Sequence, residues 1–242
     1  QKTSYQKSPQ VSRIYDHLSP QSSIWEAKIR WSRAREVARG GRRRVDLFRT
    51  YLYMIDIIEE SRKFALWEIE KYGLPHMIHF EISEEKAIEL ADKLHADKKI
   101  VQIGIYLMDL KLGQASHESK VSEHVQMSSK AAQEFLSKFD IDHDSKQKIL
   151  NCIEAHHGTI PFACIEAEIC ANADCYRFIH PKGFFLFLTI LWKRKIDFLE
   201  CLRNAEEKMN EKYKIISLDI CKKELEKYYH TLKQYIQDAK DI

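Results

Sequence analysis

Apolar residues recur at helical spacing along the chain from Asp46 onward, and this periodicity constrains the fold more than any other feature. Between Asp46 and Tyr72 they follow the period of an α-helix, and the pattern ends at Gly73 and Pro75. Further helices are predicted over residues 76–96, 99–113, 120–138, 144–157, 163–180, 184–212 and 217–238. Only seven glycines and five prolines are present, which disfavours a many-turned β sandwich. The sequence therefore predicts an all-α protein.

Charge and pattern divide the chain into three predicted parts. Residues 1–45 are expected to form a basic N-terminal arm or helix, residues 46–180 a helical core, and residues 181–242 C-terminal helices that complete the bundle. The apolar spacing of the last part does not hold a heptad for three repeats, which disfavours a partner-binding coiled coil. Oligomeric state cannot be predicted from these patterns.

The segment 28–49 is strongly basic. It carries nine Lys and Arg against two acidic residues, a local charge of +7 in a chain whose net charge is +3. Such a segment, with Trp31 available to stack on bases, could bind nucleic acid or a phosphate-rich ligand. The alternative is a solvated helix and loop around Gly40 and Gly41. A helical nucleic-acid-binding protein that uses this segment is therefore one functional hypothesis.

Neither a membrane span nor a disulfide framework is predicted. The apolar run from Phe184 to Trp192 is too short to cross a bilayer. Six cysteines show no CxxC pair and no zinc-finger spacing, a usage typical of reduced thiols. We therefore expect a cytoplasmic protein without a membrane partner.

Asp109 needs a partner more than any other residue. It lies in the apolar run from Ile100 to Leu112, whose other strongly polar side chains are Gln102 and Lys111. A carboxylate buried without a partner costs several kcal/mol, so Asp109 should meet a cation, a hydrogen-bond network or a metal. In a metal-free core, Lys111 could neutralise it.

Histidines and a second acid lie at predicted helix ends or in apolar helical stretches around Asp109. In chain order they are His79, His124, His156, His157 and Asp174. Because His156 shares a helical face with Cys152 and Ile153, it should point to the core, whereas His157 lies about 100° around the helix. We therefore expect at most one of the two to bind a metal directly.

The order of these residues resembles the HD-domain superfamily of metal-dependent phosphohydrolases, over residues 46–180. The stretch "EAHHG" followed by "EAEICANAD" is similar to the family segment in which histidines precede an acid-alanine pair and a final Asp. The resemblance implies an HD-domain-like helical bundle with N- and C-terminal helical extensions. In that family the first His, an adjacent His-Asp pair and a late Asp bind one metal. Where a second metal is present, extra histidines hold it and the Asp of the pair bridges the two ions.

One dipeptide departs from the family pattern, because Met108-Asp109 stands where the family has His-Asp. A thioether is neutral and soft, whereas Mn²⁺, Fe²⁺ and Mg²⁺ prefer imidazole and oxygen donors, so one ion loses a ligand. The resemblance still implies one or two divalent ions of Mn, Fe, Mg, Ni or Zn. The predicted metal ligands are His79, Asp109, His124, His156, His157 and Asp174.

The resemblance implies hydrolysis of a nucleotide or another phosphate ester by metal-activated water. Basic side chains would hold the phosphate, Arg by bidentate contacts. The predicted catalytic residues are Asp109, Lys111 and Arg177, and the predicted substrate-binding residues are Arg42, Arg43, Arg44 and Lys182. The alternative is a catalytically degenerate HD module that binds a nucleotide or a protein partner without turnover.

Overall fold

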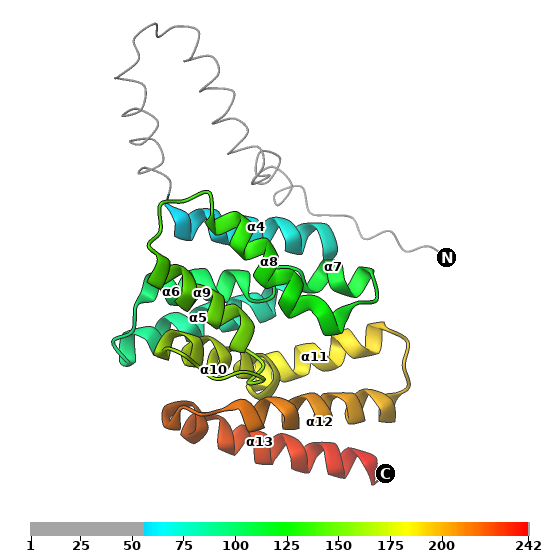
Figure 1. Cartoon of the computed structure of the whole chain (residues 1–242). Helices are drawn as coiled ribbons and strands as arrows, with labels where there is room; N and C mark the ends of the chain where they lie inside the picture. The colour runs from blue at the N-terminus through cyan, green and yellow to red at the C-terminus, as the bar shows by residue number, and fades with distance from the viewer. Residues whose placement is uncertain (1–55, 242) are drawn as a thin grey trace, which may run out of the picture. The chain divides into compact units, whose positions relative to one another are not determined.

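A computed structural model describes residues 56–241 of the chain. These residues form helices joined by short links, with no strand among them (Figure 1). The all-α prediction is therefore confirmed for this part of the chain. The basic segment 28–49, with the predicted substrate-binding residues Arg42, Arg43 and Arg44, lies outside the described residues.

Helix α4, Ile57–Tyr72, crosses the boundary between two compact units, residues 1–67 and 68–242. Its first turn carries two glutamates and its last turn Lys71, an arrangement that suits the helix dipole. The helix ends where the sequence predicted, because Gly73 adopts a left-handed φ of 76° and donates its N–H to the Ile69 carbonyl at 2.7 Å. Glycine reaches that conformation without a steric penalty.

Helix α10 lies at the centre of the second unit. The helices of this unit are α5 (Met77–Lys93), α6 (Lys98–Leu107), α7 (Leu112–His117), η1 (Val121–Glu123), α8 (His124–Leu136), α9 (His143–Ala155), α10 (Ile165–Ile179), α11 (Pro181–Lys193), α12 (Phe198–Ile215) and α13 (Asp219–Lys240). Helix α10 contacts α5, α6, α9, α11, α12 and α13, and every side chain from Ile169 to Ile179 is buried. Polar residues on such a helix must therefore find partners inside the core.

Asn172 shows how α10 meets that requirement. Its Oδ1 accepts hydrogen bonds from the backbone N–H groups of Ser217 and Leu218, both at 3.1 Å. Its Nδ2 donates to the Glu168 carbonyl at 2.8 Å and to the Ser217 hydroxyl at 2.9 Å. One buried amide thus ties α10 to the link between α12 and α13, which lie side by side (Figure 1).

The predicted helix 99–113 is interrupted around Asp109, the buried acid of the apolar run. Helix α6 ends at Leu107 and α7 begins at Leu112. In the intervening turn Leu112 donates to the Asp109 carbonyl at 3.0 Å, and the Lys111 N–H donates to Ser128 Oγ of α8 at 3.0 Å. Asp109 therefore lies at a helix end, not in mid-helix as the apolar run suggested.

The predicted helix 184–212 is also two helices. Helix α11 ends at Lys193, and Lys195 in the link has a left-handed φ of 60°. Asp197 then caps α12 by accepting the Glu200 N–H at 3.0 Å, so the sequence Asp-x-x-Glu was a start signal that the apolar pattern obscured. The other predicted helices of the described part are confirmed to within a few residues. None of the described helices combines the length and apolarity needed to cross a membrane.

Gly104→Ala should destabilise the protein by about 1–3 kcal/mol, because a Cβ there meets a packed neighbour. It would lie 2.5 Å from Cys152 Cβ and 3.0 Å from Cys152 Sγ. Urea unfolding measures the change in the free energy of unfolding. Gln102→Ala, at a half-buried position of the same helix, is the control and should change it by less than about 0.5 kcal/mol. Equal effects of the two variants would contradict tight packing at Gly104.

Candidate metal centre

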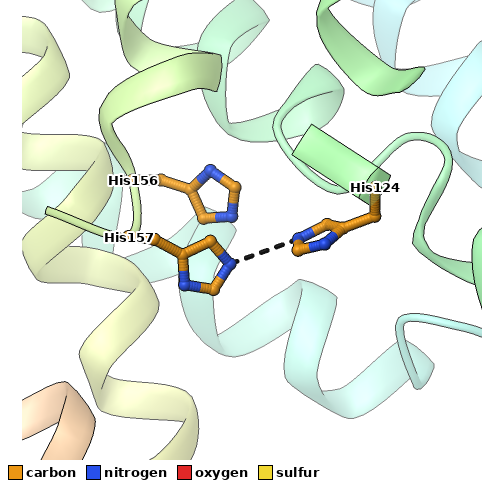
Figure 2. Close-up of side chains that lie close together, drawn as sticks. All are labelled: His124, His156 and His157. Carbon is orange, nitrogen blue, oxygen red and sulfur yellow. Dashed lines mark hydrogen bonds between the residues drawn. The ribbon is translucent and has the colours of Figure 1, made fainter. Parts of the chain in front are cut away.

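Three imidazoles converge in the second unit (Figure 2). His124 is the first residue of α8, and His156 and His157 follow directly on α9. One ring nitrogen from each lies within 4.8 Å of the other two, a group that could hold a metal ion. Nε2 of His124 and Nε2 of His157 are 3.2 Å apart. Segments separated by about thirty residues in the sequence thus contribute donors to one place.

His156 and His157 both belong to this group, although His156 points to the core as predicted, with 1% of it exposed, whereas His157 is half-buried. Their ring centroids are 4.2 Å apart. Helix α9 ends at Ala155, and Gly158, with a left-handed φ of 65°, donates its N–H to the Ala155 carbonyl at 2.7 Å. The angular separation of about 100° between neighbours applies only inside a regular helix. Both histidines lie beyond Ala155, the last residue of α9, where that spacing does not apply.

Backbone carbonyls fix which ring nitrogen faces the centre. His124 Nδ1 lies 2.6 Å from the Val121 carbonyl oxygen, and His156 Nδ1 lies 2.7 Å from that of Ile153. Because a carbonyl oxygen only accepts, each Nδ1 carries the proton and donates it. The lone pair of each ring is then on Nε2, the atom that metal ligation requires, and His124 Nε2 lies at 3.2 Å from His157 Nε2 in a hydrogen bond. Nε2 of His156 is buried and has no hydrogen-bond partner within the described part of the chain.

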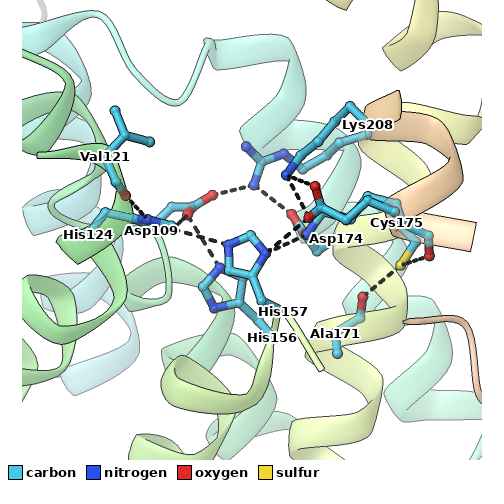
Figure 3. A network of polar contacts seen from close by, with 12 residues as sticks. Asp109, Val121, His124, His156, His157, Ala171, Asp174, Cys175 and Lys208 are labelled. Carbon is cyan, nitrogen blue, oxygen red and sulfur yellow. Dashed lines mark hydrogen bonds and ion pairs between the residues drawn. The ribbon is translucent and has the colours of Figure 1, made fainter. Parts of the chain in front are cut away.

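Asp109 lies beside the three imidazoles (Figure 3). Its Oδ1 is 3.5 Å from Nε2 of His124 and 3.5 Å from Nε2 of His156. Burial would raise the pKa of Asp109, but the Arg177 guanidinium and these two imidazoles hold it well below its usual range. Asp109 in turn raises the pKa of His124, although burial would lower it. Asp109 therefore stays ionised beside the imidazoles.

The donors present fit a divalent transition metal. An ion with ligand bonds of about 2.0–2.2 Å places tetrahedral donors about 3.3–3.6 Å apart; the ring nitrogens lie within 4.8 Å of one another, two of them at 3.2 Å, and Asp109 Oδ1, which is not in that group, lies 3.5 Å from two of them. Imidazole nitrogen with one carboxylate oxygen suits Zn²⁺, Mn²⁺, Fe²⁺ or Ni²⁺ better than Mg²⁺ or Ca²⁺, which prefer oxygen ligands. Nε2 of His156, which is buried and lacks a hydrogen-bond partner among residues 56–241, is a donor that such an ion would satisfy.

Arg177 covers the other side of Asp109. Its Nη1 contacts Asp109 Oδ2 and lies 2.7 Å from Asp174 Oδ1, and Lys212 Nζ lies 2.5 Å from Asp174 Oδ2. All four side chains are buried, with exposed fractions of 7% or less. Burial would raise the pKa of Asp174, but Lys212 and Arg177 lower it well below the usual range. Two carboxylates and two cations thus form an internally neutral cluster.

His157 connects the imidazoles to this cluster. Its Nδ1 lies 3.1 Å from Lys212 Nζ and 3.6 Å from Glu211 Oε1. Burial lowers the pKa of His157 to about 4, which keeps the ring neutral at pH 7. Sequence reasoning missed Lys212, although it shares the buried stripe of α12 with Ala205 and Met209. A lysine at helical spacing within a buried apolar stripe is the sequence signal that could have identified Lys212.

The remaining predicted site residues lie elsewhere. Lys111 Nζ pairs with Glu68 Oε1 at 2.5 Å, so the cation against Asp109 is Arg177. His79 donates from Nε2 to the Gly183 carbonyl at 3.0 Å, and burial, with Arg177 nearby, lowers its pKa to about 4. It is not in the group of three imidazoles. Lys182 is exposed near the start of α11.

The fold is that of the HD superfamily. The structure is similar to a solved predicted HD superfamily hydrolase from an uncultured Thermotogales bacterium, with a TM-score of 0.51 and 16% identity, over 79% of this chain and 95% of that one. The sequence is 33% identical over 92 residues to ribonuclease Y of Finegoldia magna, a match covering 38% of this chain and 16% of that protein. No family model matches the sequence. The resemblance to the HD-domain superfamily is confirmed by these two likenesses.

Proposed function

We propose that the chain is an HD-type metal-dependent phosphohydrolase that acts on a nucleotide or another phosphate ester. The observation that carries the proposal is the convergence of three imidazoles on the side of Asp109, with Nε2 of His156 buried and unpartnered in the described residues. The HD fold supports it. So does the partial likeness to a ribonuclease, a class of enzyme that cleaves phosphodiesters.

The chain's own side chains prepare the centre for a cation. His124, His156, His157 and Asp109 would hold the ion, which supplies Lewis-acid chemistry when bound: it activates water and polarises a phosphoryl oxygen. The carbonyls of Val121 and Ile153 accept the Nδ1 protons of His124 and His156, so the lone pair of each ring is on Nε2 before any ion arrives. This preorganisation removes the cost of reorienting the rings on binding.

Arg177 holds the carboxylate in place from the opposite side. Because its Nη1 contacts Asp109 Oδ2, the Oδ1 atom faces His124 and His156. Lys208 lies near the same network and pairs with Glu211 at 2.8 Å (Figure 3). The Lys208 side chain is 26% exposed. Its ammonium would therefore contact a phosphate that enters from solvent.

The same cluster favours a second candidate function, a non-catalytic HD module that binds a metal or a ligand without turnover. Arg177 and Lys212 neutralise Asp109 and Asp174, so neither carboxylate needs an ion to be stable in the core. Turnover of a phosphoester by the metal-loaded protein would distinguish the hydrolase from the non-catalytic module. The nucleic-acid-binding hypothesis stays a prediction, because residues 28–49 lie outside the described part.

Hydrolysis should depend on a divalent ion and on the imidazoles. After removal of metal with a chelator, the full chain should cleave bis-p-nitrophenyl phosphate, nucleotides or short RNA only when Mn²⁺, Fe²⁺, Ni²⁺ or Zn²⁺ is restored. His124→Ala should lower kcat/KM by at least about 100-fold, since even partners outside the ligand sphere cost about 10–100-fold.

His143→Ala is the matched control for that experiment. His143 is the exposed first residue of α9, so its removal should leave kcat/KM unchanged. A metal-loaded wild-type protein that cleaves no compound of this panel would refute the hydrolase and favour the non-catalytic module. Cleavage that persists in the presence of excess chelator would refute the metal dependence.

A further inference from the structure

We propose that Arg177 takes the place of a second cation, so that the centre binds one divalent ion and Asp109 bridges this ion and the guanidinium. The inference rests on the metal centre of the proposed function and decides between the one and two ions that the sequence left open. It follows from which partner each oxygen of Asp109 meets.

The two carboxylate oxygens of Asp109 face different partners. Oδ1 lies 3.5 Å from the Nε2 atoms of His124 and His156, whereas Oδ2 contacts Arg177 Nη1. One oxygen is therefore directed to the imidazoles, and the other is already satisfied by a permanent cation. A carboxylate in this arrangement can bridge two cations, but here the second cation is the Arg177 side chain and not a metal ion.

Arg177 is fixed in this position by its surroundings. It lies one turn after Asp174 on α10, and its Nη1 reaches both carboxylates. The guanidinium carbon is 5.4 Å from the centre of the Phe178 ring. Gly183 packs so closely on the backbone here that an added Cβ would lie 2.3 Å from the Arg177 carbonyl oxygen. The side chain has little room to leave, and 4% of Arg177 is exposed.

The ligands that a second ion would need are otherwise engaged. His79 Nε2 donates to the Gly183 carbonyl at 3.0 Å, and Met108, which is 1% exposed, offers only a thioether. Both carboxylates already contact Arg177. These are the positions that the HD resemblance assigns to the ion lying away from the histidine triad.

Charge gives the same result. Arg177 already contacts both Asp109 and Asp174, so a divalent ion placed between the two carboxylates would put its charge directly beside the buried guanidinium. Burial of such charge is costly without further anionic partners. An ion among the imidazoles lies on the opposite side of Asp109 and does not require Arg177 to move.

Metal stoichiometry tests the inference. The full chain, stripped of metal, is titrated with Mn²⁺, freed of excess ion by gel filtration and analysed for Mn per chain and by electron paramagnetic resonance. We expect one Mn²⁺ per chain, with the hyperfine spectrum of an isolated ion. Two ions per chain, an exchange-coupled spectrum, or no bound ion would each overturn the inference.

Variants at Met108 and Arg177 sharpen this test. Met108→His alone should still bind one ion, because Arg177 remains between the carboxylates, and Arg177→Lys should do the same. Met108→His combined with Arg177→Met should bind two ions, with circular dichroism as the check on folding. A single ion in the folded double variant, or two ions in either single variant, would overturn the inference.

The readout separates this inference from the proposed function. One ion per chain without hydrolysis of any phosphoester would leave the inference standing and refute the phosphohydrolase. Two ions per chain with metal-dependent hydrolysis would overturn the inference and support the phosphohydrolase.

Discussion

Arg177→Met should destabilise the metal-free protein by about 3–5 kcal/mol, because it leaves a buried charge without its partner. Asp109 would lose its contact with the Arg177 guanidinium, while Asp174 would keep Lys212. Urea unfolding in the presence of a chelator measures the change in the free energy of unfolding. The Arg177→Met/Asp109→Asn double variant should recover part of the loss, since it removes the uncompensated charge as well.

Arg203→Met is the matched control for this substitution. Arg203 also pairs with an acid one helical turn away, Glu200 at 2.5 Å, but its side chain is 54% exposed. The control should change the free energy of unfolding by less than about 1 kcal/mol. If Arg177→Met cost no more than Arg203→Met, the buried cluster would not contribute to stability as described.

His156→Gln should weaken Mn²⁺ binding by about 100-fold or more. The substitution keeps a side chain of similar size but removes the imidazole whose Nε2 is buried and unpartnered in the described part. Loss of a ligand should exceed the roughly 10–100-fold cost of losing a partner that only orients one. Isothermal titration calorimetry of the metal-free full chain gives the dissociation constant.

His79→Gln is the control for that titration. His79 is as deeply buried as His156, with exposed fractions of 3% and 1%, but its Nε2 donates to the Gly183 carbonyl. It should leave the dissociation constant unchanged. Equal weakening by the two substitutions would mean that His79 ligates as the family resemblance implies, and would contradict the assignment of the ion to the three other histidines.

Much of the fold could be predicted because it depends on local pattern. The helix that carries His124 and the helix that ends near His156 follow from apolar spacing and local stop signals. The break after Leu107 could not be predicted that way, because it depends on a long-range contact: the Lys111 N–H donates to Ser128 Oγ of α8. A continuous apolar run gives no sign of such a contact.

The sequence predicted most of the residues of the site but not which of them contact each other. Lys111 was the expected neutraliser of Asp109 because it is near in sequence, yet the structure gives that role to Arg177, which is 68 residues away along the chain. Asp174 and Arg177 lie one helical turn apart on α10 and pair with each other. The contact of Arg177 with Asp109 depends on how α10 packs against α6, which no spacing rule provides.

His156 and His157 show a limit of a different kind. Helical geometry placed their side chains about 100° apart, and the structure brings the ring centroids within 4.2 Å. Helix α9 ends at Ala155, so both histidines lie beyond its last residue, where the angular spacing of a regular helix does not apply. Side-chain directions are thus least predictable at helix ends, where these ligands lie.

An anomalous difference map from a crystal of the full chain soaked in Mn²⁺ tests the account most directly. We predict one peak, within about 2.0–2.2 Å of the Nε2 atoms of the three histidines, with Arg177 still in contact with Asp109 and Asp174. A peak between those two carboxylates with the guanidinium displaced, or no peak at the imidazoles, would contradict the account.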